Sequence, residues 1–277
     1  MQLEQLRQKI ARIERRNITF KPSNNGHKGV ADRGWQSGCA AIDDVLPQGR
    51  LAYDALHDFS TFRSRDTPAM DHFVLALLQR FLQTKEAGEI IWCQSHLNMR
   101  EHGHPYGPGL KALGLAPERL LFVSLRKEHD LAFAMEESLR SGAVAAVIGE
   151  GAPIGFTASR RLSIACQEMA IPCLFLNNTN TYEASAAATR WRIAPAIGPP
   201  NAADLDGPGM AAWSVSLLRA RGGCAHPGNP PSTVFWNDAT YSFNLVSAAG
   251  NRALADRAQT RPTVRSAYPA GRIGKAV

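Results

Sequence analysis

The sequence predicts an α/β fold with a mostly parallel sheet flanked by helices and with antiparallel strands added at one edge. Between residues 51 and 176, strand-like runs alternate with helical runs, a pattern typical of βαβ units and a parallel sheet. After Asn177 the β-type runs are separated only by Gly/Pro-rich loops, which favours antiparallel strands at a sheet edge. With 277 residues and 44% hydrophobic content, the chain can bury a substantial core.

The individual elements follow in chain order from their apolar spacing. A short helix is expected over 39–46 and a first strand over 51–56. Further helices are predicted over 69–82, 110–115, 130–141 and 159–170, and further strands over 89–93, 120–125, 143–148 and 172–176. Right-handed crossovers would place these helices on both faces of the sheet. The later, antiparallel strands are predicted over 189–194, 212–219 and 232–236.

The N-terminal stretch 2–16 predicts an amphipathic helix. Its apolar residues Leu3, Leu6, Ile10 and Ile13 are spaced 3, 4 and 3 residues apart and form a narrow stripe. The helix is long enough to dock on a neighbour but too short to form a stable coiled coil alone. We therefore expect it to bind a partner or a second copy; packing on its own domain is the alternative. The domain prediction is 1–33 for this helix and a linker, 34–248 for the core and 249–277 for the tail.

The charge is concentrated at the two ends of the chain. The formal net charge is +7, and residues 1–28 carry seven Lys/Arg against two Glu, whereas residues 251–277 carry six against one Asp. Basic ends on a slightly acidic body suit an acidic partner or a nucleic-acid backbone, although solvated, weakly ordered termini give the same pattern. We expect the tail to be disordered in isolation. Its candidate DNA contacts are Arg252, Arg257, Arg261, Arg265 and Arg272.

A second candidate DNA surface lies on the predicted strand 189–194. Arg190, Arg192, Arg219 and Arg221 could contact phosphates, and Trp191 and Trp213, which are nearby in sequence, could supply a stacking surface. Because side chains alternate along a strand, Arg190 and Arg192 share one face while Trp191 points into the core. An ordinary solvated strand face is the alternative interpretation.

The segment 51–84 contains neither glycine nor lysine, although its predicted strand, loop and helix resemble a nucleotide cradle. A Walker-type loop needs glycines to wrap the phosphates and a lysine to reach their charge. The loop residues that could still meet a nucleotide are His57, Asp58, Ser60, Arg63, Arg65 and Asp66. We predict no tight ATP binding, no cofactor and no enzymatic activity. A Ser60–His57–Asp58 triad is rejected, because triads are assembled by fold geometry and not by sequence proximity.

Other residue types point to no special chemistry. The five cysteines are scattered and predict reduced, mostly buried thiols. His96, His102 and His104 lie in a Gly/Pro-rich stretch without nearby cysteines, so a surface loop is favoured over a zinc site. No run approaches the ~20 apolar residues of a membrane helix, and the charged N-terminus is unlike a signal peptide. We expect a cytoplasmic protein.

Five segments together resemble the ImuA proteins, a degenerate RecA-like branch of the bacterial SOS response. The segments are 34–43, 139–150, 157–162, 188–193 and 217–223, and the resemblance spans about residues 34–245. It implies a RecA-like core in which Glu150 ends the Walker-B strand, either as a vestigial catalytic acid or as an ordinary turn carboxylate. Asn177 and Asn178 would occupy the place of a nucleotide-sensing amide, or simply form a turn.

The resemblance also implies a function. ImuA-like proteins act in damage-induced, error-prone translesion synthesis with ImuB, a Y-family polymerase homologue, and with an error-prone replicative-type polymerase subunit. The expected role is a non-catalytic adaptor that bridges these two partners, with RecA and DNA as further candidate partners and no membrane. The alternative is a DNA-binding RecA-like protein with residual nucleotide binding or ATPase activity.

Overall fold

The structure is a computed structural model that describes residues 34–246 except 85–87, 180–182, 202–206, 208 and 223–229. The predicted N-terminal helix and the predicted basic tail lie outside these residues. None of the helices in the described ranges is both long and apolar enough to cross a membrane.

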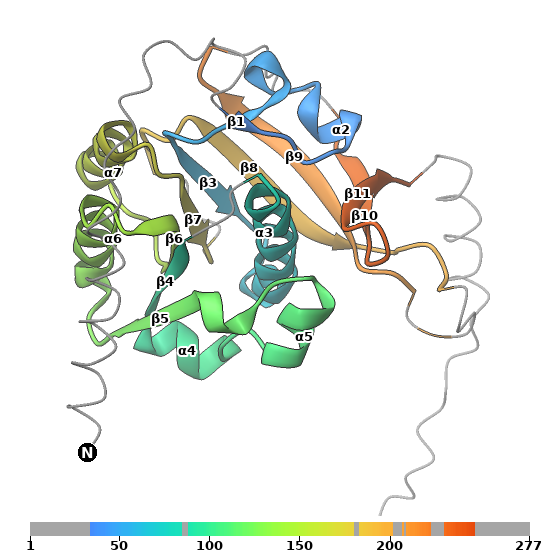
Figure 1. Ribbon diagram of the computed structural model, residues 1–277, viewed down its shortest axis with the longest axis horizontal. Coiled ribbons are helices and arrows are strands. Elements are labelled where there is room, and N and C mark those ends of the chain that lie inside the picture. Colours follow the sequence, from blue (N-terminus) through green and yellow to red (C-terminus); the bar gives the residue numbers. More distant parts are fainter. Residues whose placement is uncertain are drawn as a thin grey trace, which may run out of the picture.

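A nine-stranded sheet, counted over the described residues, organises the fold (Figure 1). Its strand order is β11-β10-β9-β8-β3-β7-β6-β4-β5. The parallel strands are β3 (Leu56–Ser60), β4 (Glu89–Ser95), β5 (Leu120–Leu125), β6 (Val144–Gly151), β7 (Cys173–Asn177) and β8 (Thr189–Ala196). The antiparallel strands are β9 (Ala212–Ala220), β10 (Ser232–Asn237) and β11 (Ser242–Leu245). The predicted fold class is confirmed, with antiparallel strands gathered beyond β8.

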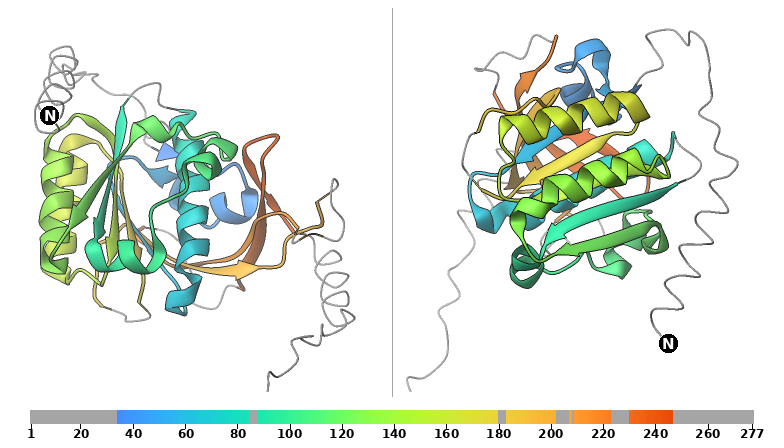
Figure 2. Two further views of the ribbon diagram at one scale, coloured as in Figure 1. Left: turned by 90° about the horizontal axis from the view of Figure 1, so that it is seen from below. Right: turned by 90° about the vertical axis from the view of Figure 1, so that its left-hand side faces the viewer.

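Helices cover both faces of this sheet, as the two views of Figure 2 show. On one face lie α2 (Ala40–Asp43), α3 (Thr67–Leu82) and α5 (Gly107–Ala112); on the other lie α6 (Leu131–Arg140) and α7 (Phe156–Met169). The helix α4 (His96–His102) follows β4. Single 3-10 turns occur at η2 (Pro47–Gly49), η3 (Ser64–Asp66), η4 (Pro117–Arg119) and η5 (Glu128–Asp130).

Each face of the sheet has its own hydrophobic core. On the α3 face the core is aromatic, and Phe73 of α3 contacts Phe59 of β3 and Trp213 of β9 with ring centroids 6.3 Å and 5.6 Å apart. On the α6 and α7 face the core is aliphatic apart from Phe175 and includes three buried cysteines. Because α3 packs across both the parallel and the antiparallel strands, it fixes the position of the loop that precedes it.

The expected strand 51–56 was wrong in its boundaries. Leu51–Ala52 forms β2, which pairs only with β1 (Gly34–Trp35) in a separate two-stranded sheet. The central strand instead covers Leu56–Ser60 and runs through a polar stretch that reads as loop. The apolar run 51–56 was a misleading signal, because burial of polar groups in β3 is decided by partners on neighbouring strands.

Candidate functional site

The carboxyl ends of four neighbouring parallel strands meet at one edge of the sheet. In register, Ser60 of β3 and Gly151 of β6 both pair with Asn177 of β7, and Gln94 of β4 pairs with Glu150 of β6. In open α/β sheets, ligands bind at the carboxyl ends of the strands where the strand order reverses. This edge, with the start of α3 above it, is therefore the first place to look for a site.

The loop between β3 and α3 is a compact turn. The Thr61 hydroxyl donates to the Arg63 carbonyl at 3.1 Å, and the Asp66 N–H donates to the same carbonyl at 2.8 Å. Residues 51–84 are all described, and none of them has a positive φ. A phosphate-wrapping loop depends on glycines, because only glycine readily adopts the positive φ that lets the backbone N–H groups surround a phosphate. In this turn the Thr61 hydroxyl and the Asp66 N–H form hydrogen bonds within the turn.

The first turn of α3 has lost two of the N–H groups that would face a phosphate. The Thr67 N–H donates to the Ser64 carbonyl, and Pro68 has no N–H. The N-cap residue is Asp66, whose carboxylate lies 4.0 Å from the Arg65 guanidinium. A negative charge at a helix start favours the helix but opposes a phosphate at the same place.

Three of the predicted loop residues belong to β3 and are buried, which corrects the sequence-based prediction. His57 contacts the Thr189 hydroxyl at 2.7 Å through Nδ1 and the Ala52 carbonyl at 2.9 Å through Nε2. The Ser60 hydroxyl donates to the Trp191 carbonyl at 2.9 Å. Burial lowers the pKa of His57 to about 4, against the smaller opposing effects of the Ala52 carbonyl and the charge of Asp54. These groups stabilise the pairing of β3 with β8 and cannot reach a ligand.

Asp58, the third of these residues, is buried and forms an ion pair with the partly buried Arg190. Its Oδ2 accepts from the Arg190 Nε at 3.1 Å. Burial raises the pKa of Asp58, and the charge of Arg190 opposes that rise. Of the predicted loop residues, only Arg63, Arg65 and Asp66 lie between the strand and the helix, and the Arg65 side chain is 73% exposed.

The predicted DNA-contacting arginines of β8 also have intramolecular roles. Arg190 donates to the Glu183 carbonyl at 2.6 Å in addition to its ion pair, while Trp191 is buried in the core as predicted. Arg192 lies over the exposed ring of Phe62, 4.3 Å from its centroid. Arg219 and Arg221 likewise donate to carbonyls of the segment before β8. Arg190, Arg219 and Arg221 thus link β8 and β9 to β3 and to the segment before β8. DNA binding by these arginines stays a prediction.

Glu150 is 1% exposed and lies at the end of β6. Its Oε2 accepts from Trp92 Nε1 at 3.1 Å and from Gln94 Nε2 at 2.9 Å, while its Oε1 is buried without a hydrogen-bond partner among the described residues. Burial raises the pKa of Glu150 to about 7, against the effect of these two donors. Gly149 beside it admits Met135 of α6, whose sulfur lies where a Cβ atom would be. The packing of Met135 against Gly149 thus fixes the orientation of β6 next to the Glu150 carboxylate.

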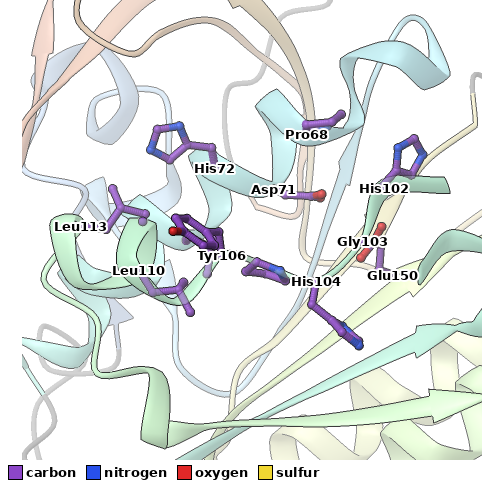
Figure 3. A pocket seen from close by; sticks show the side chains of 13 residues that line it. Pro68, Asp71, His72, His102, Gly103, His104, Tyr106, Leu110, Leu113 and Glu150 are labelled. Atoms are coloured by element: carbon purple, nitrogen blue, oxygen red, sulfur yellow. The ribbon is translucent and has the colours of Figure 1, made fainter. Parts of the chain in front are cut away.

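Asp71 of α3 lies near Glu150, and sequence reasoning missed it. Burial raises the pKa of Asp71 well above its usual range, and the charge of Glu150 adds to the effect. Both residues line a cavity of about 290 Å³ between α3 and residues 102–113, to which His72, His102 and His104 also contribute (Figure 3). An acidic residue inside the apolar run 69–82 was the signal that could have identified it. The described residues hold no cluster of three or more side chains suited to bind a metal ion.

Asn177, the last residue of β7, and Asn178, the residue after it, both form hydrogen bonds within the protein. Asn178 Nδ2 donates to Asn98 Oδ1 at 2.7 Å, and the N–H and hydroxyl of Thr179 both donate to Asn177 Oδ1 at 3.0 Å. The Asn177 bonds are those expected of a turn residue, whereas the Asn178 bond joins the end of β7 to α4. The N-terminal stripe Leu3, Leu6, Ile10 and Ile13 and the tail arginines Arg252, Arg257, Arg261 and Arg265 lie outside the described residues.

The strand order and the helix arrangement define the class of protein, an α/β domain with a RecA-like core. A scan against models of known protein families finds no match. The protein named Protein ImuA of Caulobacter vibrioides is 30% identical over 194 residues in each of two strains, NA1000 / CB15N and CB 15. The alignment covers 66% of this chain and 77% of that protein. This chain belongs to the ImuA family.

The buried carboxyl of Glu150 predicts a pH-dependent difference between the wild type and Glu150→Gln. Unfolded, this carboxyl ionises near 4.5; folded, it keeps its proton to about 7, so the folded state binds more protons between these values. The group therefore makes the protein less stable as pH rises through this window. Since glutamine cannot ionise, the variant should gain on the wild type by on the order of 2 to 3 kcal/mol from pH 4.5 to 7.

Urea unfolding at several pH values measures this difference. The comparison cancels the opposite contribution of His57, whose lowered pKa makes stability rise with pH in the same window. Glu168→Gln is the matched control, because it makes the same chemical change at a half-exposed position on α7, on the opposite face of the sheet. A constant difference for Glu150→Gln would contradict the prediction.

Proposed function

We propose that this protein is a non-catalytic RecA-like accessory protein of damage-induced, error-prone translesion DNA synthesis. In this proposal it bridges an ImuB-like Y-family polymerase homologue and an error-prone replicative-type polymerase subunit in the cytoplasm. Membership in the ImuA family supports a role in damage-induced translesion synthesis. The loss of the phosphate cradle at the start of α3 supports the absence of catalysis.

The first turn of α3 is the observation that carries the non-catalytic part of the proposal. A RecA-like core that turns over ATP needs a loop and a helix start that hold the phosphates and a metal ion. Here one N–H is bonded to Ser64, another is replaced by Pro68, and Asp66 places negative charge at the same end. The exposed arginines of the turn supply point charge only, worth about 1 kcal/mol or less. The sheet remains as a rigid scaffold whose surfaces and termini make contacts.

We expect no micromolar binding of ATP, with or without Mg²⁺, because the backbone donors for its phosphates are missing. Isothermal titration calorimetry with the full chain measures this directly, and a nucleotide hydrolysis assay accompanies it. Micromolar affinity, or turnover that Arg65→Ala abolishes, would show a functional nucleotide site and support the alternative of residual ATPase activity.

Replacing Leu3, Leu6, Ile10 and Ile13 with serine should abolish co-purification with the ImuB-like partner or dissociate self-association, because the predicted docking stripe is removed. Co-purification with and without DNA and ATP, together with light scattering, measures both. The matched control replaces Gln2, Gln5 and Gln8, which lie off the stripe, with serine and should retain binding. Unchanged partner capture and oligomeric state after loss of the stripe would reject the docking role.

Replacing Arg252, Arg257, Arg261 and Arg265 with serine should weaken binding to single-stranded DNA and reduce its salt dependence. For every phosphate that the tail no longer neutralises, the slope of log affinity against log salt becomes shallower by about 0.7. Fluorescence anisotropy at several salt concentrations measures the slope. The control Arg160→Ser removes an exposed arginine of α7 and should leave the slope unchanged. DNA binding that ignores salt, or that the tail variant retains in full, would refute this role for the tail.

A further inference from the structure

The cavity beside α3 has a composition that the proposed function does not use. The helix contributes Asp71 and His72 to one wall, the end of α4 and the segment after it contribute His102 to Tyr106, and Glu150 closes the inner end. Figure 3 shows the carboxyl ends of Asp71 and Glu150 directed toward one another. Two acidic groups from different elements therefore share one cavity of about 290 Å³.

Both carboxyls have an oxygen without a donor. Glu150 Oε1 and Asp71 Oδ1 are buried and have no hydrogen-bond partner among the described residues, and Glu150 as a whole is 1% exposed. A buried acceptor left without a donor is costly, by about 1 to 3 kcal/mol and more if charged. A ligand with N–H groups could therefore donate the hydrogen bonds that Glu150 Oε1 and Asp71 Oδ1 lack.

The described residues that line the cavity include no lysine or arginine. Buried carboxyls are normally paired with a cation or protonated, because like charges in a low-dielectric site oppose each other's ionisation. The burial effects on Asp71 and Glu150 agree with this, since both side chains hold their protons more tightly than usual. When ionised, the two carboxylates repel a phosphate, and when protonated they offer it no positive charge, which separates this cavity from a nucleotide-phosphate site.

The mouth of the cavity carries an aromatic ring. Tyr106 is 75% exposed although it is a large aromatic residue, and it lines the cavity together with His104, which contacts Phe122 with ring centroids 4.6 Å apart. A cation near the face of an aromatic ring is stabilised by the ring quadrupole. The aromatic mouth and the acidic inner end of the cavity are thus both complementary to a cation.

We propose that this cavity binds a cationic nitrogen group, a guanidinium or an ammonium, through the carboxylates of Asp71 and Glu150 with Tyr106 at the mouth. The group supplies donors to the two open oxygens and the positive charge that the cavity lacks. It comes either from a free small molecule or from a basic side chain of a bound peptide. The site is independent of the polymerase-bridging role.

The test uses N-acetyl-arginine amide as the probe and N-acetyl-citrulline amide as its neutral isostere, titrated into the full chain at pH 8 by NMR. At this pH His72, whose pKa is lowered by burial, is neutral and does not compete for the two carboxylates. The arginine derivative should bind in the millimolar range and the citrulline derivative should not. Asp71→Asn and Glu150→Gln should each weaken binding about tenfold or more, because each removes a charged hydrogen bond.

Two further variants keep the result interpretable. Glu168→Gln changes the net charge by the same amount as Glu150→Gln but on α7, across the sheet from the cavity, and should bind like the wild type. Tyr106→Ala, at an exposed position, should fold normally and bind a few times more weakly. A peptide Gly-Gly-Arg-Gly-Gly that binds more tightly than the amide identifies a peptide side chain as the source, whereas equal binding identifies a small molecule. Absence of binding, equal binding of citrulline, full binding by Glu150→Gln, or capture of Mg²⁺ instead would overturn the proposal.

Discussion

The contacts between the two central strands β3 and β8 hold the two halves of the sheet in register. The contact between His57 and Thr189 is buried and the Asp58–Arg190 ion pair is partly buried, and each leaves a costly unpaired group if its partner is removed. Through β8 these contacts orient the antiparallel strands, and through β3 they orient the turn that leads into α3. The polar residues of β3 are thus structural, and their positions determine where the carboxyl edge of the sheet lies.

At that edge the charge is opposite to what a phosphate site requires. Asp66 at the start of α3, Asp71 one turn later and Glu150 at the end of β6 make the region acidic. A helix start with free N–H groups attracts anions, whereas this one has used or lost two of them. The RecA-like arrangement of elements is retained while the chemistry of its switch point is changed, which fits an adaptor better than a motor.

The sequence predicted the fold class and the helices more reliably than the site. The apolar periodicity of 69–82 located α3 well, and the absence of glycine and lysine in 51–84 was visible at once. The strand boundary failed at 51–56, because hydrogen-bond partners on β8 make the polar stretch of β3 suitable for burial. Asp71 was overlooked because its partner is 79 residues away in sequence, and only the packing of α3 beside β6 brings the two carboxyls to one cavity.

The sequence by itself determined the alternation of strands and helices, the side-chain alternation on β8 that buries Trp191, and the missing phosphate-loop residues. These features depend on local spacing and residue type. The tertiary structure alone decided that Arg190 forms an ion pair with Asp58, that His57 and Ser60 are buried in β3, and that Asp71 and Glu150 share a cavity. Such features depend on distances between residues far apart in the chain, and desolvation acts on a group only after the fold has enclosed it.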